Sequence, residues 1–103
     1  MLVSKSKYSD GDIISMKISN GDEVVAKYVG ESSEWFEVTK PMVVVTTQKG
    51  IVLMPALFTS EPGTNQIRFA HIMLHGSTDE QMKSHYIGQT TGIQTIPKSS
   101  IIT

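Results

Sequence analysis

Hydrophobic and polar residues alternate with a period of two in the first third of the chain. Between residues 12 and 19, apolar side chains occupy every second position, which predicts a β-strand with one buried face. The pair Asn20-Gly21 follows and suits a two-residue type I′ turn, because both residues tolerate positive φ. Apolar residues dominate again over residues 22–30, so we predict a β-hairpin here.

Three more strands are predicted where β-branched and aromatic residues form short runs between turn residues. They cover residues 34–47, 51–58 and 66–75. Pro41 interrupts the first of these after Lys40, and because proline donates no backbone hydrogen bond, we expect a bend, a bulge or a sheet edge there. The pattern predicts an all-β barrel or sandwich; of the two, we expect a five-stranded, strongly bent antiparallel small barrel.

The pattern after Gly76 is typical of a short helix. Thr78 and Gln81 have the spacing of a capping box, and the two residues between them are acidic, as the helix dipole favours. We predict that the helix ends near Ile87, with Gly88 as the residue that terminates it. Three of its side chains are expected to dock on the barrel: Met82, His85 and Tyr86.

These elements divide the chain into three regions. We predict a barrel over residues 1–76, a short helix over 77–88 and an extended or poorly ordered tail over 89–103. The tail contains more isoleucine than a purely disordered segment favours, which indicates that it packs on another surface, such as that of a neighbouring subunit. These isoleucines are Ile93, Ile96, Ile101 and Ile102.

The charge balance limits the classes of partner. Nine Lys and Arg residues stand against ten Asp and Glu residues, for a net charge of −1, so nucleic acid would have to bind at a local basic patch. The chain has no cysteine, which excludes disulfides, thiolate metal sites and cysteine nucleophiles. The first residues lack the apolar segment of a signal peptide, and we expect a cytoplasmic protein, in the host cytoplasm if the source is viral.

Candidate catalytic chemistry is sparse. The chain has no nucleophile elbow, phosphate-binding loop, dinucleotide fingerprint or zinc-protease motif, so we expect no enzyme activity, no cofactor and no small-molecule substrate. His71 and His75 have metal-ligand spacing on a helix, but on the expected strand they are about 13 Å apart. We therefore expect two hydrogen-bonded histidines at a strand end and no metal site.

The hairpin carries a family resemblance. Residues 14–30, an alternating strand, a polar turn ending in glycine and a second strand ending in glycine, resemble the first half of the Sm1 motif of the Sm/Lsm-like small β-barrels. The dipeptide Ile67-Arg68 is similar to the start of the second Sm motif, with Phe69 where the family has glycine. The resemblance implies a barrel that binds single-stranded RNA and assembles into rings. The whole chain is also similar to small proteins of marine T4-like phages, which implies no activity.

Two aromatic residues and two cations are the candidates for RNA contact. Trp35 and Phe36 follow the second strand, where the resemblance places a base, and Lys40 and Arg68 are the candidate phosphate or base partners. An exposed aromatic ring stacks on an unpaired base for about 1–3 kcal/mol. Trp35 and Phe36 point to opposite faces of a strand, so we expect one of them in the core. The nearby acidic residues repel phosphate, which favours a structural role for both rings; they are Glu31, Glu34 and Glu37.

Self-assembly is the function that the strand pattern favours. The expected edges, residues 42–58 and 66–74, are flat, long and apolar and carry few charges, so they are open to pairing with another chain. The resemblance implies that the fourth strand of one subunit pairs with the fifth of the next. Pro41 and Pro55 hinder strand pairing, because proline donates no backbone hydrogen bond. They favour the alternative that these strands enclose the core of one subunit and form no interface. The competing function is a phage accessory or structural protein that uses the fold for protein contacts only. The candidate interface residues are Ile51, Leu53, Leu57, Ile67, Phe69, Ile72 and Leu74.

Overall fold

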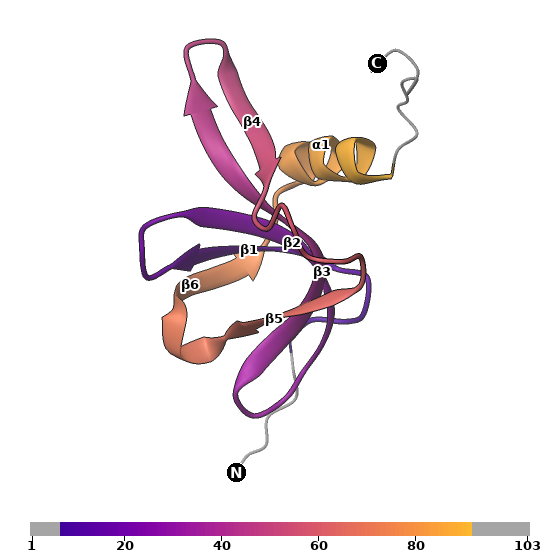
Figure 1. Cartoon of the computed structure of the whole chain (residues 1–103). Coiled ribbons are helices and arrows are strands. Elements are labelled where there is room, and N and C mark those ends of the chain that lie inside the picture. The colour runs from indigo at the N-terminus through magenta and orange to yellow at the C-terminus, as the bar shows by residue number, and fades with distance from the viewer. Residues whose placement is uncertain (1–6, 92–103) are drawn as a thin grey trace.

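A computed structural model describes residues 7–91, which form one antiparallel sheet and one short helix (Figure 1). The sheet has six strands, one more than predicted. The strands are β1 (Ile13–Ile18), β2 (Glu23–Glu31), β3 (Trp35–Thr47), β4 (Gly50–Pro55), β5 (Thr64–Arg68) and β6 (Ile72–Ser77). A one-turn 3₁₀ helix, η1 (Phe69–His71), joins the last two, and α1 (Glu80–Thr90) follows. The all-β prediction with a short C-terminal helix is confirmed.

The first hairpin forms where the alternation predicted it, but its turn differs. The N–H of Gly21 donates to the carbonyl of Ile18 (2.8 Å), and the N–H of Ile18 donates to the carbonyl of Asp22 (2.9 Å). Gly21 has φ +95°, whereas Asn20 is not in the left-handed region. The loop is therefore the three-residue type with glycine at its bulge, and the predicted type I′ turn is wrong. The Asn20 side chain instead accepts from the N–H of Asp22 (2.9 Å).

The predicted irregularity at Pro41 is a β-bulge inside one long strand. Thr39 pairs with Lys27 and Met42 pairs with Val25, so Lys40 and Pro41 together lie opposite one residue of β2. Lys40 has φ +50°, a conformation that ordinary side chains rarely adopt. Bulges bend a strand. Before the bulge β3 pairs with β5, and after it β3 pairs with β4 (Figure 1).

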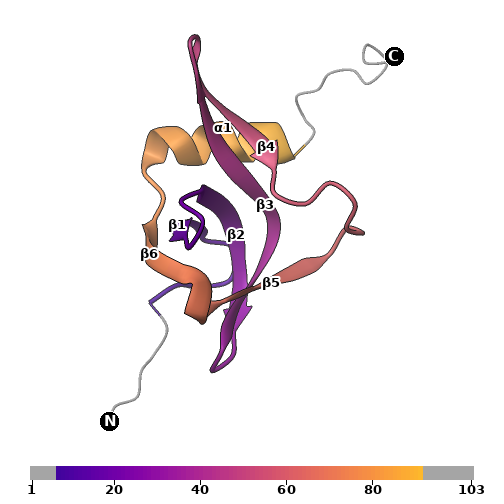
Figure 2. The ribbon, with the colours of Figure 1, turned by 60° about the vertical axis from the view of Figure 1, so that its left-hand side comes forward.

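The predicted last strand, residues 66–75, is two strands separated by η1. β5 pairs with β3 at one side of the sheet, and β6 pairs with β1 at the other. The chain therefore crosses from one side of the sheet to the other through η1. Two backbone hydrogen bonds fix this segment: the N–H of Phe69 donates to Glu34 O (2.9 Å), and the N–H of Ser19 donates to His71 O (2.8 Å). Figure 2 shows the two strands on opposite sides of the bent sheet. Within the described residues β5 and β6 do not pair with each other, so the sheet is not closed into a barrel.

Two apolar clusters lie on the two faces of the sheet. The inner cluster is enclosed by the bent strands, and the outer cluster lies beneath α1. The inner cluster consists of Tyr8, Ile14, Met16, Val24, Ala26, Tyr28, Phe36 and Val38. The outer cluster consists of Ile13, Val25, Met42, Leu53 and Tyr86. In β3 the even-numbered residues face inward before the bulge and outward after it, because the extra residue shifts the alternation by one.

The helix begins one residue later than predicted. The Asp79 carboxylate accepts from the N–H of Met82 (2.8 Å) and is the N-cap. Thr78, the predicted cap, directly follows β6 and bonds β1 instead: its N–H donates to Ile13 O (3.1 Å) and its hydroxyl bonds that of Ser15 (2.8 Å). The helix continues past Gly88 to Thr90. The tail beyond residue 91 lies outside the described residues.

Tyr86 fastens the helix to the bulge. Its ring is 1% exposed, and its hydroxyl donates to the carbonyls of Lys40 (2.7 Å) and Thr39 (3.2 Å). The Lys40 ammonium in turn donates to Thr90 O at the end of the helix (2.9 Å), where the helix dipole favours a cation. Met82 packs on the outer cluster as predicted, whereas His85 is exposed.

Alkaline pH is expected to weaken this attachment. Burial raises the pKa of the Tyr86 phenol from 10.0 to about 12. The folded state therefore favours the neutral phenol, so its stabilising effect is complete below pH 10 and is lost as the pH rises through about 12. Urea unfolding from pH 9 to 12 checks this expectation: the difference in unfolding free energy between the wild type and Tyr86→Phe should shrink over that range. A constant difference would contradict it.

Candidate functional site

Trp35 and Arg68, two of the four residues predicted to contact RNA, are direct partners across β3 and β5. The Arg68 guanidinium lies 5.4 Å from the centre of the Trp35 ring, a cation–π arrangement. Both side chains also bind acids. Arg68 pairs with Glu34 (3.1 Å), and the Trp35 indole N–H donates to Glu37 (3.3 Å). The structure thus brings the expected aromatic ring and cation together, but each of them also bonds a carboxylate.

The other two predicted RNA contacts lie elsewhere. Phe36 is 3% exposed and belongs to the inner cluster, so the prediction that one of the adjacent aromatics is core is confirmed, and Phe36 does not share a face with Trp35. Lys40 is at the bulge of β3, and its ammonium donates to Thr90 O at the end of α1. No surface of the described residues unites all four.

Two apolar strands form the ends of the sheet, β4 at one end and β6 at the other. Within residues 7–91 no strand pairs with the outer edge of either, although the Gln89 side chain of α1 donates to Leu53 O of β4 (3.0 Å). Neither strand contains a Lys, Arg, Asp or Glu residue, the charges that normally protect an edge. Large apolar side chains on them are exposed: Ile51, Val52 and Met54 on β4, and Met73 and Leu74 on β6.

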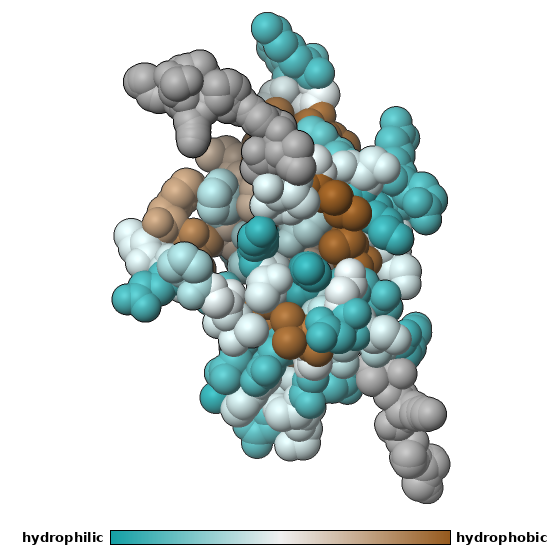
Figure 3. All heavy atoms as spheres, turned by 90° about the vertical axis from the view of Figure 1, so that its right-hand side faces the viewer, coloured by the Kyte–Doolittle hydropathy of each residue, from teal (hydrophilic) through white to brown (hydrophobic). Residues whose placement is uncertain are grey.

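The seven predicted interface residues fall into three groups. Ile51 and Leu74 are exposed on the edge strands, while Leu57 is exposed in the loop after β4. Leu53 is 4% exposed because it faces α1 in the outer cluster. The remaining three pack against the inner cluster; they are Ile67, Phe69 and Ile72. In the face shown in Figure 3, apolar side chains reach the surface in separate patches among polar ones.

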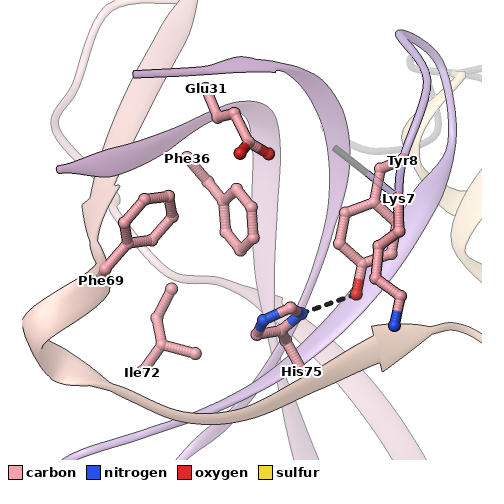
Figure 4. A pocket seen from close by; sticks show the side chains of 7 residues that line it. All are labelled: Lys7, Tyr8, Glu31, Phe36, Phe69, Ile72 and His75. Carbon is pink, nitrogen blue, oxygen red and sulfur yellow. Dashed lines mark hydrogen bonds between the residues drawn. The ribbon is translucent and has the colours of Figure 1, made fainter. Parts of the chain in front are cut away.

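A pocket of about 370 Å³ opens beside the inner cluster (Figure 4). The Phe36 ring stands at 84° to the Phe69 ring, with centroids 4.8 Å apart, and at 86° to the His75 ring, with centroids 5.2 Å apart. These three rings form walls of the pocket. The other lining residues are Lys7, Tyr8, Glu31 and Ile72.

Hydrogen bonds hold two polar groups of this pocket in place. The Tyr8 hydroxyl and His75 Nδ1 lie 2.7 Å apart, and the Tyr28 hydroxyl donates to the Glu31 carboxylate (2.9 Å). Burial, followed by the nearby negative charge of Glu31, raises the pKa of the Tyr8 phenol. Tyr8 therefore stays protonated at neutral pH. The ammonium of Lys7 lies 5.9 Å from the centre of the Tyr8 ring.

His71 and His75 each hydrogen-bond a different side chain. His71 is in η1 with its Nδ1 3.2 Å from the Ser19 hydroxyl, and His75 bonds Tyr8. Residues 7–91 contain no group of three or more His, Asp or Glu side chains placed to hold a metal ion. No helix in the same residues has both the length and the apolar character needed to cross a lipid bilayer.

Comparison with known proteins leaves the family open, since no protein-family model and no curated protein matches the chain. The candidate surfaces therefore rest on geometry.

The sequence did not reveal the pocket. Its lining comes from the segment before β1, the end of β2, the start of β3, η1 and β6, and no short motif joins these. Tyr8 was the hardest residue to predict, because it precedes the first strand by five residues and still enters the core. The one available signal was that Phe36 and Phe69 are aromatic residues within predicted strands.

Proposed function

We propose that the protein is a non-enzymatic, Sm-like small-barrel module that self-associates through its two end strands. The observation that carries this proposal is the pair of uncharged apolar edges, β4 and β6, at opposite ends of one sheet. Ordinary soluble domains protect such edges with charge, proline or a covering element. In this chain Pro55 ends β4, but four uncharged residues precede it in the strand after Gly50.

The two edges are different surfaces, so their pairing would be head-to-tail. An interface between unlike surfaces propagates from copy to copy and closes into a ring when the rotation allows. The hairpin of β3 and β4 projects from the sheet (Figure 1), and Ile51, Val52 and Met54 of β4 are exposed, so a second copy can approach this strand. A register shift between Lys17 and Ile18 places a bulge on β6 near Met73, so strand pairing would be short and side-chain contacts would contribute most of the stability.

Sedimentation velocity over a range of protein concentrations tests the assembly. We expect the wild type to exceed the monomer mass of 11.3 kDa. Val52→Lys on β4 or Leu74→Lys on β6 should each return the protein to a monomer, because a charge at the edge blocks pairing. An equal mixture of the two variants should form a dimer, since each retains the edge that the other lacks.

The matched control is Phe58→Lys, which replaces an exposed apolar residue of the loop after β4 by the same charge. It should assemble like the wild type. A wild type that stays monomeric at every concentration rejects the proposal. Assembly that survives Leu74→Lys but not Val52→Lys would instead indicate a symmetric contact of β4 with β4, and would reject the head-to-tail arrangement.

Single-stranded RNA is the second candidate function, and the observation that favours it is the Trp35–Arg68 pair on one face of β3 and β5. A stacked ring beside a cation suits an unpaired base. Glu34 and Glu37 oppose it, and without RNA binding the fold would serve protein contacts only, as in a phage accessory or structural protein. Anisotropy of a labelled oligouridine across a salt series separates the two, since phosphate contacts weaken steeply with salt.

A further inference from the structure

The pocket beside the inner cluster combines aromatic walls with one carboxylate. Phe36 stands at nearly right angles to Phe69 and to His75, and in a T-shaped pair the edge of one ring meets a face of the other, so the ring that contributes its edge keeps both of its own faces available. Glu31 lies at the rim next to Phe36 (Figure 4). The walls are therefore apolar and rich in π-electrons, and the lining holds one negative charge, Glu31, and one positive charge, Lys7.

This chemistry selects against several ligand classes. An anion beside Phe36 and Phe69 would meet the Glu31 carboxylate, because the Lys7 ammonium lies on the Tyr8 side of the pocket (Figure 4). A primary ammonium is strongly hydrated, and the Phe36 and Phe69 rings offer it no oxygen or nitrogen partner to replace that water. An ammonium that carries methyl groups keeps the positive charge, has less hydration to lose and presents methyl groups to the rings. Aromatic side chains attract such cations through the negative faces of their rings.

We propose that this pocket binds a methylated ammonium group, of the kind found in choline or in a trimethylated lysine side chain. A volume of about 370 Å³ accommodates one such group and the start of the chain that carries it. The geometry next to the pocket already places a cation over one of its rings, because the Lys7 ammonium lies 5.9 Å from the centre of the Tyr8 ring. Lys7 also lines the pocket, so its charge opposes a bound cation.

The test compares choline with 3,3-dimethylbutanol, the neutral molecule of nearly the same shape, by amide chemical-shift titration of the full chain. Choline should bind about tenfold more tightly than the alcohol, the difference expected when the charge contributes through the rings and Glu31. Equal affinities would overturn the proposal, because they would show that shape and hydrophobicity alone fill the pocket. Binding of neither molecule would overturn it as well, provided that the trimethyllysine peptide described next also fails to bind.

A short peptide containing trimethyllysine distinguishes the two sources of the group. Tighter binding of the peptide than of choline supports a protein side chain as the ligand, and the reverse supports a small molecule. The same peptide with unmodified lysine should bind at least about tenfold more weakly. If the unmodified peptide binds equally well, the proposal fails.

Three variants test the assigned roles, and Trp35→Leu is the control because it removes an aromatic ring from the opposite face of β3. Glu31→Gln and Phe69→Leu should each weaken choline binding several-fold with little effect on the neutral alcohol. Lys7→Met should strengthen choline binding, since it removes a like charge from the lining. The amide spectrum of each variant establishes that it is folded. Unchanged choline affinity in folded Glu31→Gln and Phe69→Leu would overturn the proposal.

Discussion

Replacing Tyr86 by alanine is expected to lower the free energy of unfolding by about 3–5 kcal/mol, the usual cost of removing a large buried aromatic side chain. The ring is 1% exposed and joins residues of β1, β2, β3 and β4 in the outer cluster. The variant also leaves the carbonyls of Thr39 and Lys40 without the tyrosine hydroxyl. For a domain of this size each kcal/mol corresponds to about 4–8 °C in Tm. Thermal unfolding followed by circular dichroism should therefore show a fall of more than about 12 °C.

The loss should be concentrated in one part of the molecule. An isolated helix of the 11 residues of α1 is marginal in water, so α1 depends on its attachment. The inner cluster shares no residue with the outer one. In the variant, hydrogen exchange should therefore accelerate most in α1 and β4 and least in β1. His85→Ala, which changes an exposed neighbour on the same helix, should leave both Tm and exchange nearly unchanged. A uniform acceleration over the sheet would contradict this division.

The predictable parts of the fold are those in which a local pattern decides the structure. The first hairpin follows from alternation, and the irregularity in β3 follows from the proline at position 41, which cannot donate to a ladder. The docking of Met82 and Tyr86 follows from helical spacing. In each case a backbone requirement or a repeated apolar position lies within a few residues of the element that it specifies.

The features that were missed depend on contacts between distant segments. Thr78 has the sequence of an N-cap, yet it completes the pairing of β6 with β1 through Ile13, and the cap falls to the next residue. The apolar segment that ends at His75 has the pattern of one strand. In the structure its first part pairs with β3, its last part pairs with β1, and η1 separates the two. The bulge shifts the alternation of β3, which buries Met42 on the outer face. Sequence spacing cannot specify which partner a strand will meet.

The candidate sites also depend on contacts between segments that are distant in the sequence. The sequence indicated that Trp35 and Phe36 lie on opposite faces but could not decide which of them is buried, because that choice depends on where Tyr8, Phe69 and His75 lie. Lys40 was a reasonable candidate for phosphate contact as a cation beside an aromatic pair. Its ammonium instead satisfies a carbonyl at the end of α1, 50 residues away in the sequence.

The neighbouring residues Trp35 and Phe36 are expected to differ sharply in what each contributes to stability. Phe36→Ala should lower the free energy of unfolding by about 3–5 kcal/mol, because the ring is 3% exposed and its removal leaves a cavity among packed rings. The Phe36 ring contacts four others: Tyr8, Tyr28, Phe69 and His75. Trp35→Ala removes a larger side chain, but one that is only half-buried, and should cost about 1–2 kcal/mol. Urea unfolding followed by circular dichroism measures both.

Which of the two alanine substitutions lowers the free energy of unfolding more is more informative than either value. If Phe36 supplied a stacking surface for a ligand and Trp35 were the core residue, Trp35→Ala would be the more destabilising change, and that result would reject the assignment of the two faces. Phe36→Leu retains most of the apolar volume, so it should recover most of the stability that Phe36→Ala loses. Because the Phe36 ring is also a wall of the pocket, Phe36→Leu should still weaken choline binding. Its role in folding and its proposed role in binding are thereby separated in one side chain.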